Sequence, residues 1–370
     1  MTVLGTRPEL IRTSSLTRLI DENATQFVIH TGQNASPGLN DIFFNELNIR
    51  EPDLRLEPNF KTFGSFVSEI FPKVETEIRR FEPEAFVVLG DTNSALTALL
   101  AKKLGVAVYH LEAGNRSFDP NVPEELNRRL VDQIADVNLP YSEFARQNLI
   151  REGFNPRFIF KSGSPMNEVI SNFQGKFASS SVLERLNLKP DSYFVVSLHR
   201  QENINQMSRL RSALDALDDL RRATGKKVVV SCHPRLSSQL KFVKELNDDW
   251  ITEEPFGFFD YMNLQINSHC VISDSGSVSE EASLLGFSAV TLRDSMERQE
   301  ALELGVVTMS GLTSESLKEA VHFAVRSSPQ EIPTDYKGSD FSHRVWSVIS
   351  STARLIPMWT GFRGLDPIDQ

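Results

Sequence analysis

Three carboxylates in the first third of the chain have the types and spacing needed for proton transfer at carbon. Asp91 follows the apolar run AFVVLG, Glu112 follows VAVYHL, and Glu124 comes after Pro123 at the start of a helix-period stretch. Carboxylates that share one pocket raise one another's pKa, so that one of them can carry a proton at neutral pH. This combination is typical of general acid–base chemistry.

A second group of residues suits a phosphate-bearing ligand. The segment SDSGSVSEEASLLG follows the apolar run CVI. Its small residues Ser275, Gly276 and Ser277 form a turn at which a helix is predicted to begin. Free N–H groups and the positive end of the helix dipole bind pyrophosphate at such a turn. One of the two acids in the first helical turn, Glu280 or Glu281, could accept the two hydroxyls of a ribose. A serine-capped helix with acidic first-turn residues is also an ordinary stabilising feature, and this alternative stays open.

Three further polar residues follow apolar runs. Arg7 comes after TVLG, His199 after YFVVSL and His233 after VVVSC. Ligands of open parallel sheets bind at the carboxyl ends of the strands, so these side chains are candidates for contact with a diphosphate. The simpler interpretation of His199 is a satisfied core histidine.

Several candidates have equally plain structural interpretations. Asp91 could cap the helix that follows it, and Glu124 could be a first-turn acid paired with Arg128. Arg12 could be only a surface charge on the first helix. Phe256, in PFGFFDY, could stack on a base or belong to a core loop.

A strand–turn–helix unit repeats along the chain and would position these residues. The predicted strands are 1–5, 27–30, 85–90, 106–111, 137–140, 158–163, 193–199, 227–233, 269–274 and 288–293. The helix-period stretches are 11–21, 64–81, 92–104, 123–135, 142–152, 206–224, 235–246, 277–286 and 340–356. Uninterrupted apolar strands that alternate with helices predict parallel sheets covered on both faces.

The length of 370 residues and the number of strands favour two domains. A polar, serine-rich and weakly patterned segment at 165–192 marks the seam. We therefore expect an α/β protein with two Rossmann-like domains that face each other across a cleft. The first covers 1–168, with a C-terminal helix at about 340–370 packing back on it, and the second covers 169–339.

Composition excludes several classes of partner and cofactor. A net charge of −10 argues against nucleic acid and anionic membranes. The sequence shows neither a signal peptide nor an apolar run long enough to span a bilayer, and Cys232 and Cys270 have no metal-ligand pattern. We expect a cytoplasmic protein. The fingerprints of nicotinamide and ATP sites and the D-x-D pair of metal-dependent sugar-nucleotide sites are missing, so we expect no cofactor and no metal.

Taken together, the strand ends resemble the non-hydrolysing UDP-N-acetylglucosamine 2-epimerase family, whose fold is that of the GT-B glycosyltransferases. The motifs that carry the resemblance are GTRPE, HTGQN, GDTNS, EAGNR, PEELNR, GSPM, HRQEN, CHPR, DSGSVSEE and RDSMERQE. They occur in family order from residue 5 to about residue 311.

Within the family, the chain is similar to the branch that makes UDP-N-acetyl-L-fucosamine from its talose epimer. The similar features are EAGNR followed by Phe118 and Asp119, GSP followed by Met166, and PFGFFDY. The enzymes for UDP-N-acetylglucosamine tend to carry EAGLRT, GNPVID and a lysine where this chain has Arg12. Asn34 also departs from their TGQH motif, and we do not carry allosteric activation over.

The resemblance implies roles for individual residues. Asp91, Glu112 and Glu124 would form the acid/base set, with the order of their action left open, and His199 would join them at the diphosphate. The UDP-binding residues would be Arg7, His233, Ser275, Gly276, Ser277 and Glu281. Weaker candidates are Arg12, Arg116, Asp119, Phe256 and Arg298.

The segment between the two glutamates divides into parts under this hypothesis. Arg116 and Asp119 would help to select the sugar, whereas Glu125, Arg128 and Arg129 would form a charged helix face. The family also implies a homodimer that acts on a UDP-sugar in bacterial surface polysaccharide synthesis.

Three other functions remain open from the sequence. One is interconversion of UDP-N-acetylglucosamine and UDP-N-acetylmannosamine. Another is a GT-B glycosyltransferase, which would share the fold and the UDP cradle but has less need of three clustered acids. The last is a sugar-nucleotide sensor without catalytic activity.

Overall fold

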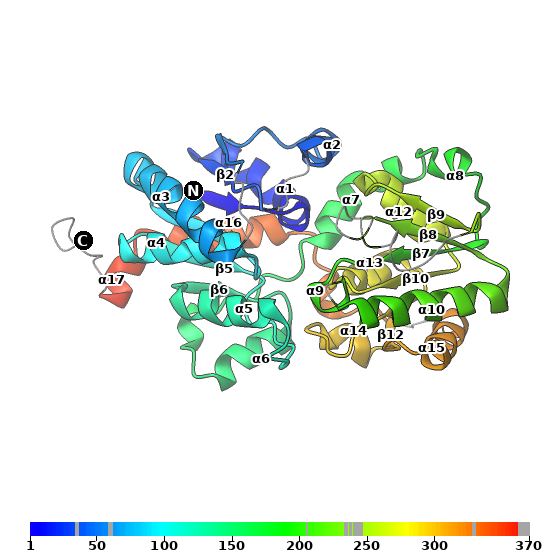
Figure 1. Ribbon diagram of the computed structural model, residues 1–370. Coiled ribbons are helices and arrows are strands. Elements are labelled where there is room, and N and C mark those ends of the chain that lie inside the picture. Colours follow the sequence, from blue (N-terminus) through cyan, green and yellow to red (C-terminus); the bar gives the residue numbers. More distant parts are fainter. Residues whose placement is uncertain are drawn as a thin grey trace. The chain divides into compact units, whose positions relative to one another are not determined.

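The computed structural model describes residues 1–33, 37–57, 62–204, 206–232, 236, 239, 247–327 and 331–361. The chain forms two compact units (Figure 1). Unit 1 contains residues Met1–Val169 and Gly338–Gln370, and unit 2 contains Ile170–Lys337. Unit 1 is therefore built from two separate stretches of the sequence.

A six-stranded parallel sheet forms the centre of unit 1. Its strands are β1 (Thr2–Leu4), β2 (Val28–His30), β3 (Leu54–Arg55), β4 (Ala85–Leu89), β5 (Ala107–Leu111) and β6 (Val137–Leu139). They lie in the order β3-β2-β1-β4-β5-β6, and every pair is parallel. The direction of winding reverses between β1 and β4, which is where doubly wound sheets bind their ligands.

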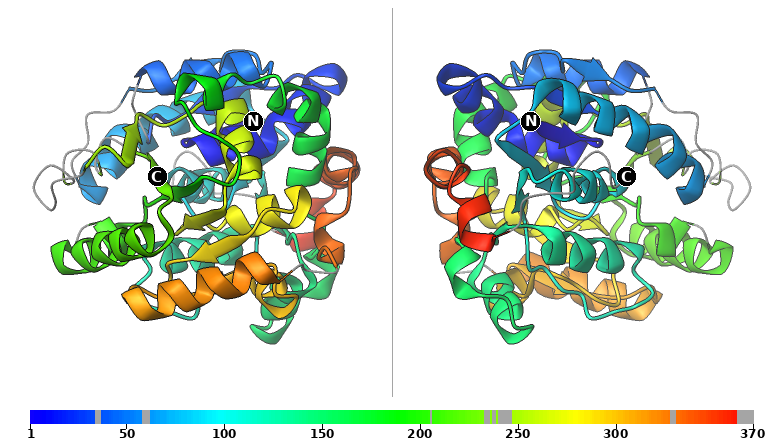
Figure 2. Two further views of the ribbon diagram at one scale, coloured as in Figure 1. Left: turned by 90° about the vertical axis from the view of Figure 1, so that its right-hand side faces the viewer. Right: turned by 90° about the vertical axis from the view of Figure 1, so that its left-hand side faces the viewer.

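Helices cover both faces of this sheet because alternate strand residues point to opposite sides. One face packs on α3 (Phe63–Phe81), α4 (Ala98–Lys103) and α5 (Pro123–Ile134). The other packs on α1 (Arg7–Asn23) and on α16 (Phe341–Thr352), which the chain forms after it has left unit 2. Figures 1 and 2 show this orange-to-red C-terminal segment. The remaining helices of unit 1 are α2 (Pro37–Glu46), α6 (Glu143–Arg151) and α17 (Ile356–Thr360).

Unit 2 repeats the same strand order. Its strands are β7 (Tyr193–Ser197), β8 (Lys227–Ser231), β9 (Trp250–Glu253), β10 (Cys270–Ser273), β11 (Ala289–Thr291) and β12 (Val307–Met309). They lie parallel in the order β12-β11-β10-β7-β8-β9, so winding reverses between β7 and β10.

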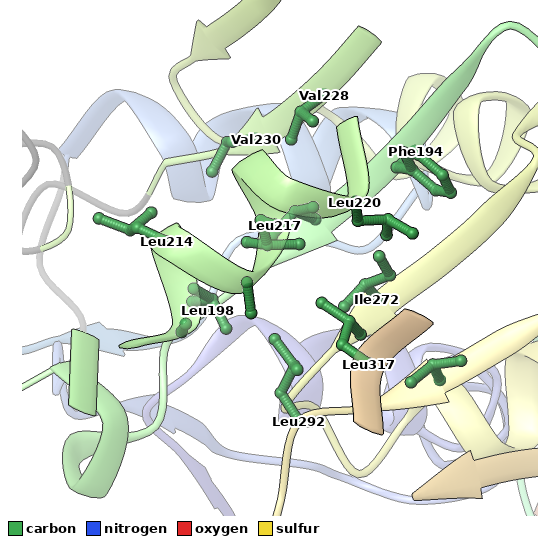
Figure 3. Packing of buried hydrophobic residues seen from close by; sticks show 14 of the residues in the cluster. Phe194, Leu198, Leu214, Leu217, Leu220, Val228, Val230, Ile272, Leu292 and Leu317 are labelled. Carbon is green, nitrogen blue, oxygen red and sulfur yellow. The ribbon is translucent and has the colours of Figure 1, made fainter. Parts of the chain in front are cut away.

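The helices of unit 2 also form two layers. Helices α10 (Met207–Thr224) and α15 (Ser314–Arg326) cover one face, where Leu214 and Leu217 pack over Val228 and Val230 (Figure 3). The opposite face is covered by α8 (Val182–Arg185), α12 (Phe258–Asn267), α13 (Val278–Leu285) and α14 (Gln299–Glu303). Two more helices are α7 (Met166–Phe177), which crosses the boundary between the units, and α9 (Gln201–Ile204).

The predicted class, two parallel-sheet Rossmann-like domains with a C-terminal helix on the first, is confirmed. Three strands were missed, namely β3, β9 and β12, and the predicted strand at 158–163 makes only one bridge, between Ile159 and Asn138. The predicted seam at 165–192 includes the boundary between the two units, at Val169 and Ile170, but it also contains helices α7 and α8, which its weak patterning did not indicate. The predicted helix at 235–246 falls mostly outside the described residues.

The two cysteines and the apolar character of the helices can also be compared with the sequence predictions. Both cysteines are buried, and burial raises the pKa of the Cys232 thiol to about 11. Across the described ranges, none of the helices combines the length and apolar character that a membrane span requires.

Candidate active site

The turns after β1 and β4 are joined by a buried carboxylate, Glu9. Its Oε2 accepts hydrogen bonds from the Gly5 backbone N–H at 2.9 Å and from the Thr6 hydroxyl at 2.7 Å, and its Oε1 accepts one from the Thr92 hydroxyl at 2.9 Å. Burial raises the pKa of Glu9 to about 7, although these hydrogen bonds act in the opposite direction. Glu9 therefore ties the Gly5–Thr6 turn, which precedes Arg7, to Thr92, the residue after Asp91.

Gly5 shows how closely the turns after β1 and β4 approach each other. A Cβ at this position would lie 2.0 Å from the Ser94 hydroxyl and 2.4 Å from that of Thr31, so no side chain fits. Arg7 opens α1, and its guanidinium carbon lies 5.6 Å from the centre of the Phe43 ring. The GTRPE motif thus forms a tight connection between β1 and α1, in which Arg7 is half-buried.

Glu112 lies directly after β5 in the left-handed backbone region, with φ of 64°. Its carboxylate forms an ion pair with Arg12 of α1 and accepts a hydrogen bond from the Asn115 amide at 3.3 Å. Only 7% of the Arg12 side chain and 11% of the Glu112 side chain are exposed. The surface-charge interpretation of Arg12 is therefore wrong, because α1 buries this residue against the β5 turn. A strained backbone of this kind is common at functional sites.

Asp91 lies two residues after β4 and is held from α5. The Arg128 guanidinium donates to its Oδ2 from Nε at 3.1 Å and from Nη2 at 2.5 Å, and the Asn127 amide donates to its backbone carbonyl at 2.9 Å. Arg128 also contacts Glu125, and both residues are buried. The expectation of a charged, exposed helix face is wrong for these two residues, since this face of α5 points at the end of the sheet.

Glu124 lies in the first turn of α5, four residues before Arg128 and therefore on the same helix face. It is half-buried. Register pairs Leu89 of β4 with Leu111 of β5, so Asp91 and Glu112 leave neighbouring strands at the same edge. The structure thus places the three predicted carboxylates on elements that meet at the carboxyl end of the unit 1 sheet.

The two residues expected to select the sugar behave differently. Arg116 is 1% exposed, and its guanidinium contacts Asp132 at 2.7 Å and Glu152 at 2.6 Å. This burial contradicts a sugar contact for Arg116 and makes it an anchor of the loop. Asp119 is half-buried, and its Oδ1 accepts hydrogen bonds from the backbone and side chain of Asn121 at 2.9 and 2.8 Å.

In unit 2, Asp274 joins the ends of β7 and β10. Its carboxylate accepts hydrogen bonds from the backbone N–H groups of His199 and Arg200 and from the Asn203 amide. The His199 Nδ1 lies 3.1 Å from Oδ1. Burial opposes the charge of Asp274, but the charge of His199 and these hydrogen bonds lower its pKa to about 2.

The His199 side chain itself is 45% exposed. The interpretation of His199 as a core histidine is therefore wrong. An imidazole whose Nδ1 is fixed by a buried carboxylate and whose ring is open to solvent can contact an anionic ligand.

The Ser275–Ser277 turn links β10 to α13. Ser275 and Ser277 hydroxyls lie 2.9 Å apart, and the three residues of the turn are half-buried. A Cβ on Gly276 would lie 2.8 Å from Oε1 of Glu297, which forms ion pairs with Arg200 and Arg293. The turn thus packs against a buried charged cluster formed by Glu297, Arg200 and Arg293. It is followed by the N-terminus of α13, and a helix N-terminus favours anions.

Three of the predicted site residues of unit 2, Arg298, Phe256 and Glu281, are buried. Arg298 is 2% exposed and forms an ion pair with Glu280 at 3.2 Å. Phe256 is 6% exposed and belongs to the hydrophobic core under α12, so the core interpretation holds and stacking on a base is contradicted. Glu281 is also buried, and it accepts a hydrogen bond from the Gln265 amide at 2.8 Å. His233 lies outside the described residues.

Each unit therefore carries one set of candidate functional residues at the point where the winding of its sheet reverses. Unit 1 carries carboxylates, which can move protons, and unit 2 carries an exposed histidine beside a helix N-terminus, which can hold an anion. Sequence reasoning missed Arg128 and underrated Arg12. The only available signal was their occurrence in motifs at strand ends and helix starts.

Comparison with known proteins assigns the chain to a family. A family profile described as UDP-N-acetylglucosamine 2-epimerase matches residues 18–350. The UDP-N-acetylglucosamine 2-epimerase of Methanocaldococcus jannaschii is 36% identical over 86% of this chain and 90% of its own length. The UDP-2,3-diacetamido-2,3-dideoxy-D-glucuronate 2-epimerase of Pseudomonas aeruginosa is 31% identical over 93% of this chain and 97% of its own length.

Solved structures agree with these sequence relatives. The M. jannaschii enzyme in complex with UDP-GlcNAc and UDP has a TM-score of 0.89 at 32% identity, covering 95% of this chain and 99% of that one. The UDP-N-acetylglucosamine 2-epimerase of Rickettsia bellii has a TM-score of 0.91 at 35% identity, covering 98% of both chains. The GT-B-type fold class is thereby confirmed. The chain is therefore an isomerase of the UDP-N-acetylglucosamine 2-epimerase family.

Proposed function

We propose that this protein inverts C2 of a UDP-linked 2-acetamido sugar by eliminating UDP and adding it back. The observation that carries the proposal is the convergence of Asp91, Glu112 and Glu124 at one end of the unit 1 sheet. A route through elimination needs carboxylates that remove and return protons, together with a site for the departing diphosphate.

The chemistry follows from the poor acidity of the C2 hydrogen, which has no neighbouring carbonyl. The C1–O bond breaks first, and its electron pair leaves with the phosphate oxygen of UDP. Positive charge at C1 then acidifies the C2 hydrogen, a carboxylate takes that proton, and a C1–C2 double bond forms. A carboxylic acid returns a proton to the opposite face of C2 while the UDP oxygen adds to C1.

We assign the acid/base roles to Asp91, Glu112 and Glu124 of unit 1. The diphosphate would be held by Arg7, His199 and the Ser275–Ser277 turn. For His199, support comes from its exposed ring and from the fixed Nδ1 contact with Asp274. For the turn, support comes from its position before α13.

For the sugar, we propose the pair UDP-2-acetamido-2,6-dideoxy-L-talose and UDP-N-acetyl-L-fucosamine. Arg12 and Asn115 replace the lysine and leucine typical of the UDP-N-acetylglucosamine motifs, and both contact Glu112. Two departures that meet on one proposed acid/base residue favour a substrate that differs near the reacting carbon. Asp119 is the further candidate for contact with this sugar.

Incubation with each UDP-sugar in D₂O tests the proposal. We expect deuterium at C2 of the deoxy-L pair, detected by NMR together with formation of the epimer. Asp91→Asn should slow this exchange by roughly 100-fold or more, as expected for loss of a general acid or base.

The second candidate is interconversion of UDP-N-acetylglucosamine and UDP-N-acetylmannosamine. It is favoured by the relative from M. jannaschii, at 36% identity. Deuterium in that pair and not in the deoxy-L pair would select it. Release of UDP that depends on an acceptor, without exchange at C2, would instead indicate a glycosyltransferase, and UDP binding without any exchange would indicate a sensor.

A further inference from the structure

Arg128 makes the most direct protein contact with Asp91. Two nitrogens of its guanidinium, Nε and Nη2, donate to the same carboxylate oxygen, Oδ2, at 3.1 and 2.5 Å. Among the described residues, the hydrogen bonds to the Asp91 carboxylate are all made through Oδ2. The Asp91 side chain is 27% exposed, whereas that of Arg128 is 2% exposed. A buried cation thus holds one side of a partly exposed carboxylate.

Glu125 extends this contact to the loop that follows β5. Its Oε2 accepts a hydrogen bond from Nη1 of Arg128 at 3.0 Å and others from the Ser117 backbone and hydroxyl at 2.9 and 3.0 Å. Burial opposes the charge of Glu125, but the Ser117 backbone hydrogen bond and the charge of Arg128 hold its pKa below the usual value. Asp91, Arg128, Glu125 and Ser117 therefore form an unbroken series of polar contacts.

The shape of the arginine side chain explains why this position suits it. A guanidinium is planar and presents donors in several fixed directions, so one residue can hold two carboxylates at a defined angle. A lysine offers a single charged point on a flexible stem and cannot fix both partners in the same way. The arrangement determines the direction of the Asp91 carboxylate, which surface ion pairs do not do.

We propose that Arg128 is a positioning residue that orients Asp91 for proton transfer, and that Glu125 keeps Arg128 in place. The inference rests on the proposed acid/base role of Asp91. Arg128 acts through Asp91 and need not contact the sugar, so its loss should lower kcat and leave KM nearly unchanged.

The test uses the full chain with Arg128→Gln, Arg128→Lys, Asp91→Asn and the double variant Asp91→Asn/Arg128→Gln. The measured quantities are kcat and KM for C2 exchange in D₂O and the midpoint of thermal unfolding. We expect Arg128→Gln to lower kcat by about 100-fold, as for a misplaced catalytic group, and Arg128→Lys to restore part of it. In the Asp91→Asn background, Arg128→Gln should cost little more.

Arg129→Gln is the matched control. Arg129 is the next residue on α5 and also bonds Glu125, at 3.0 Å, but it is 43% exposed and its ion pairs are with Glu125 and Glu152. Its substitution should leave kcat almost unchanged. Losses that multiply in the double variant, or an equal loss in Arg129→Gln, would overturn the proposal.

Thermal unfolding keeps the inference separate from the proposed function. If the unaltered protein exchanges no UDP-sugar, the proposed function fails. The four variants still show whether Asp91 and Arg128 are coupled, because the midpoint shifts of a contacting pair do not add. Additive shifts would remove the support for positioning, whereas non-additive shifts would retain it.

Discussion

At the scale of single residues, Glu9 links stability to pH. Its pKa is raised from 4.5 to about 7 by burial, so the folded protein keeps it protonated where the unfolded chain has lost the proton. The stability that this group contributes is fully present below about pH 4.5 and is lost as the pH rises to about 7. The shift corresponds to roughly 3 kcal/mol.

We therefore expect Glu9→Gln to remove this component of the pH dependence. Urea unfolding at pH 4.5 and at pH 7.5 should show the free energy of unfolding of the unaltered protein falling by about 3 kcal/mol relative to that of the variant. Glu22→Gln is the control, because Glu22 is an exposed acid on the same helix. Parallel pH profiles for Glu9→Gln and the unaltered protein would contradict the prediction.

The sequence was sufficient to place Asp91, Glu112 and His199 at strand ends, because apolar runs and parallel-sheet topology determine which residues emerge there. It was insufficient for Arg12 and Arg128. Helical periodicity shows that an arginine lies on a polar face but does not show what that face meets. Their burial depends on carboxylates 100 and 37 positions away in the sequence.

At the scale of elements, the turn between β10 and α13 depends on the size of one residue. We expect Gly276→Ala to weaken UDP binding by about tenfold, because overpacking at a tight site costs 1–3 kcal/mol. The new Cβ would meet Glu297, which two arginines hold in place. Titration calorimetry with UDP measures the effect.

Gly175→Ala provides the comparison for this substitution. Gly175 lies within α7, and a Cβ there would meet no atom within 4 Å. The change should leave UDP binding unaltered and stabilise the helix by up to about 1 kcal/mol. UDP affinity equal to that of the unaltered protein in Gly276→Ala would rule the turn out as the UDP cradle.

Edge position explains which strands the sequence concealed. β3, β9 and β12 are outermost in their sheets, and each carries residues that are half-buried or exposed. Such strands lack the long apolar run that identifies a central parallel strand. Helix α7 was overlooked for another reason, since its serine and glycine content masked the apolar residues Val169, Ile170, Phe173 and Phe177.

At the scale of the whole molecule, the C-terminal helix α16 belongs to unit 1. Ile349 is 4% exposed and packs in the core that α16 shares with α1 and β5. We expect Ile349→Ala to destabilise unit 1 by about 2–5 kcal/mol and to leave unit 2 unchanged. Ser350→Ala, at the exposed neighbouring position, is the control.

The three tryptophans allow the two units to be followed separately. Trp250 lies in the core of unit 2, whereas Trp346 and Trp359 pack on the core of unit 1. Denaturant unfolding can be followed by tryptophan fluorescence. In Trp250→Phe the remaining signal comes from unit 1, and in the double variant Trp346→Phe/Trp359→Phe it comes from unit 2. Equal shifts of both transitions in Ile349→Ala would contradict the prediction.

The discontinuity of unit 1 has a consequence for synthesis on the ribosome. The strands of its sheet emerge first, yet the apolar face formed by Leu16, Val87 and Tyr109 is covered by Phe341 and Val345 of α16. All of unit 2 must be translated before those residues appear. During that interval the nascent chain exposes an apolar surface that α16 later covers, and chaperones bind surfaces of this kind. Unit 1 is translated first, yet its core is completed only after unit 2 has been translated.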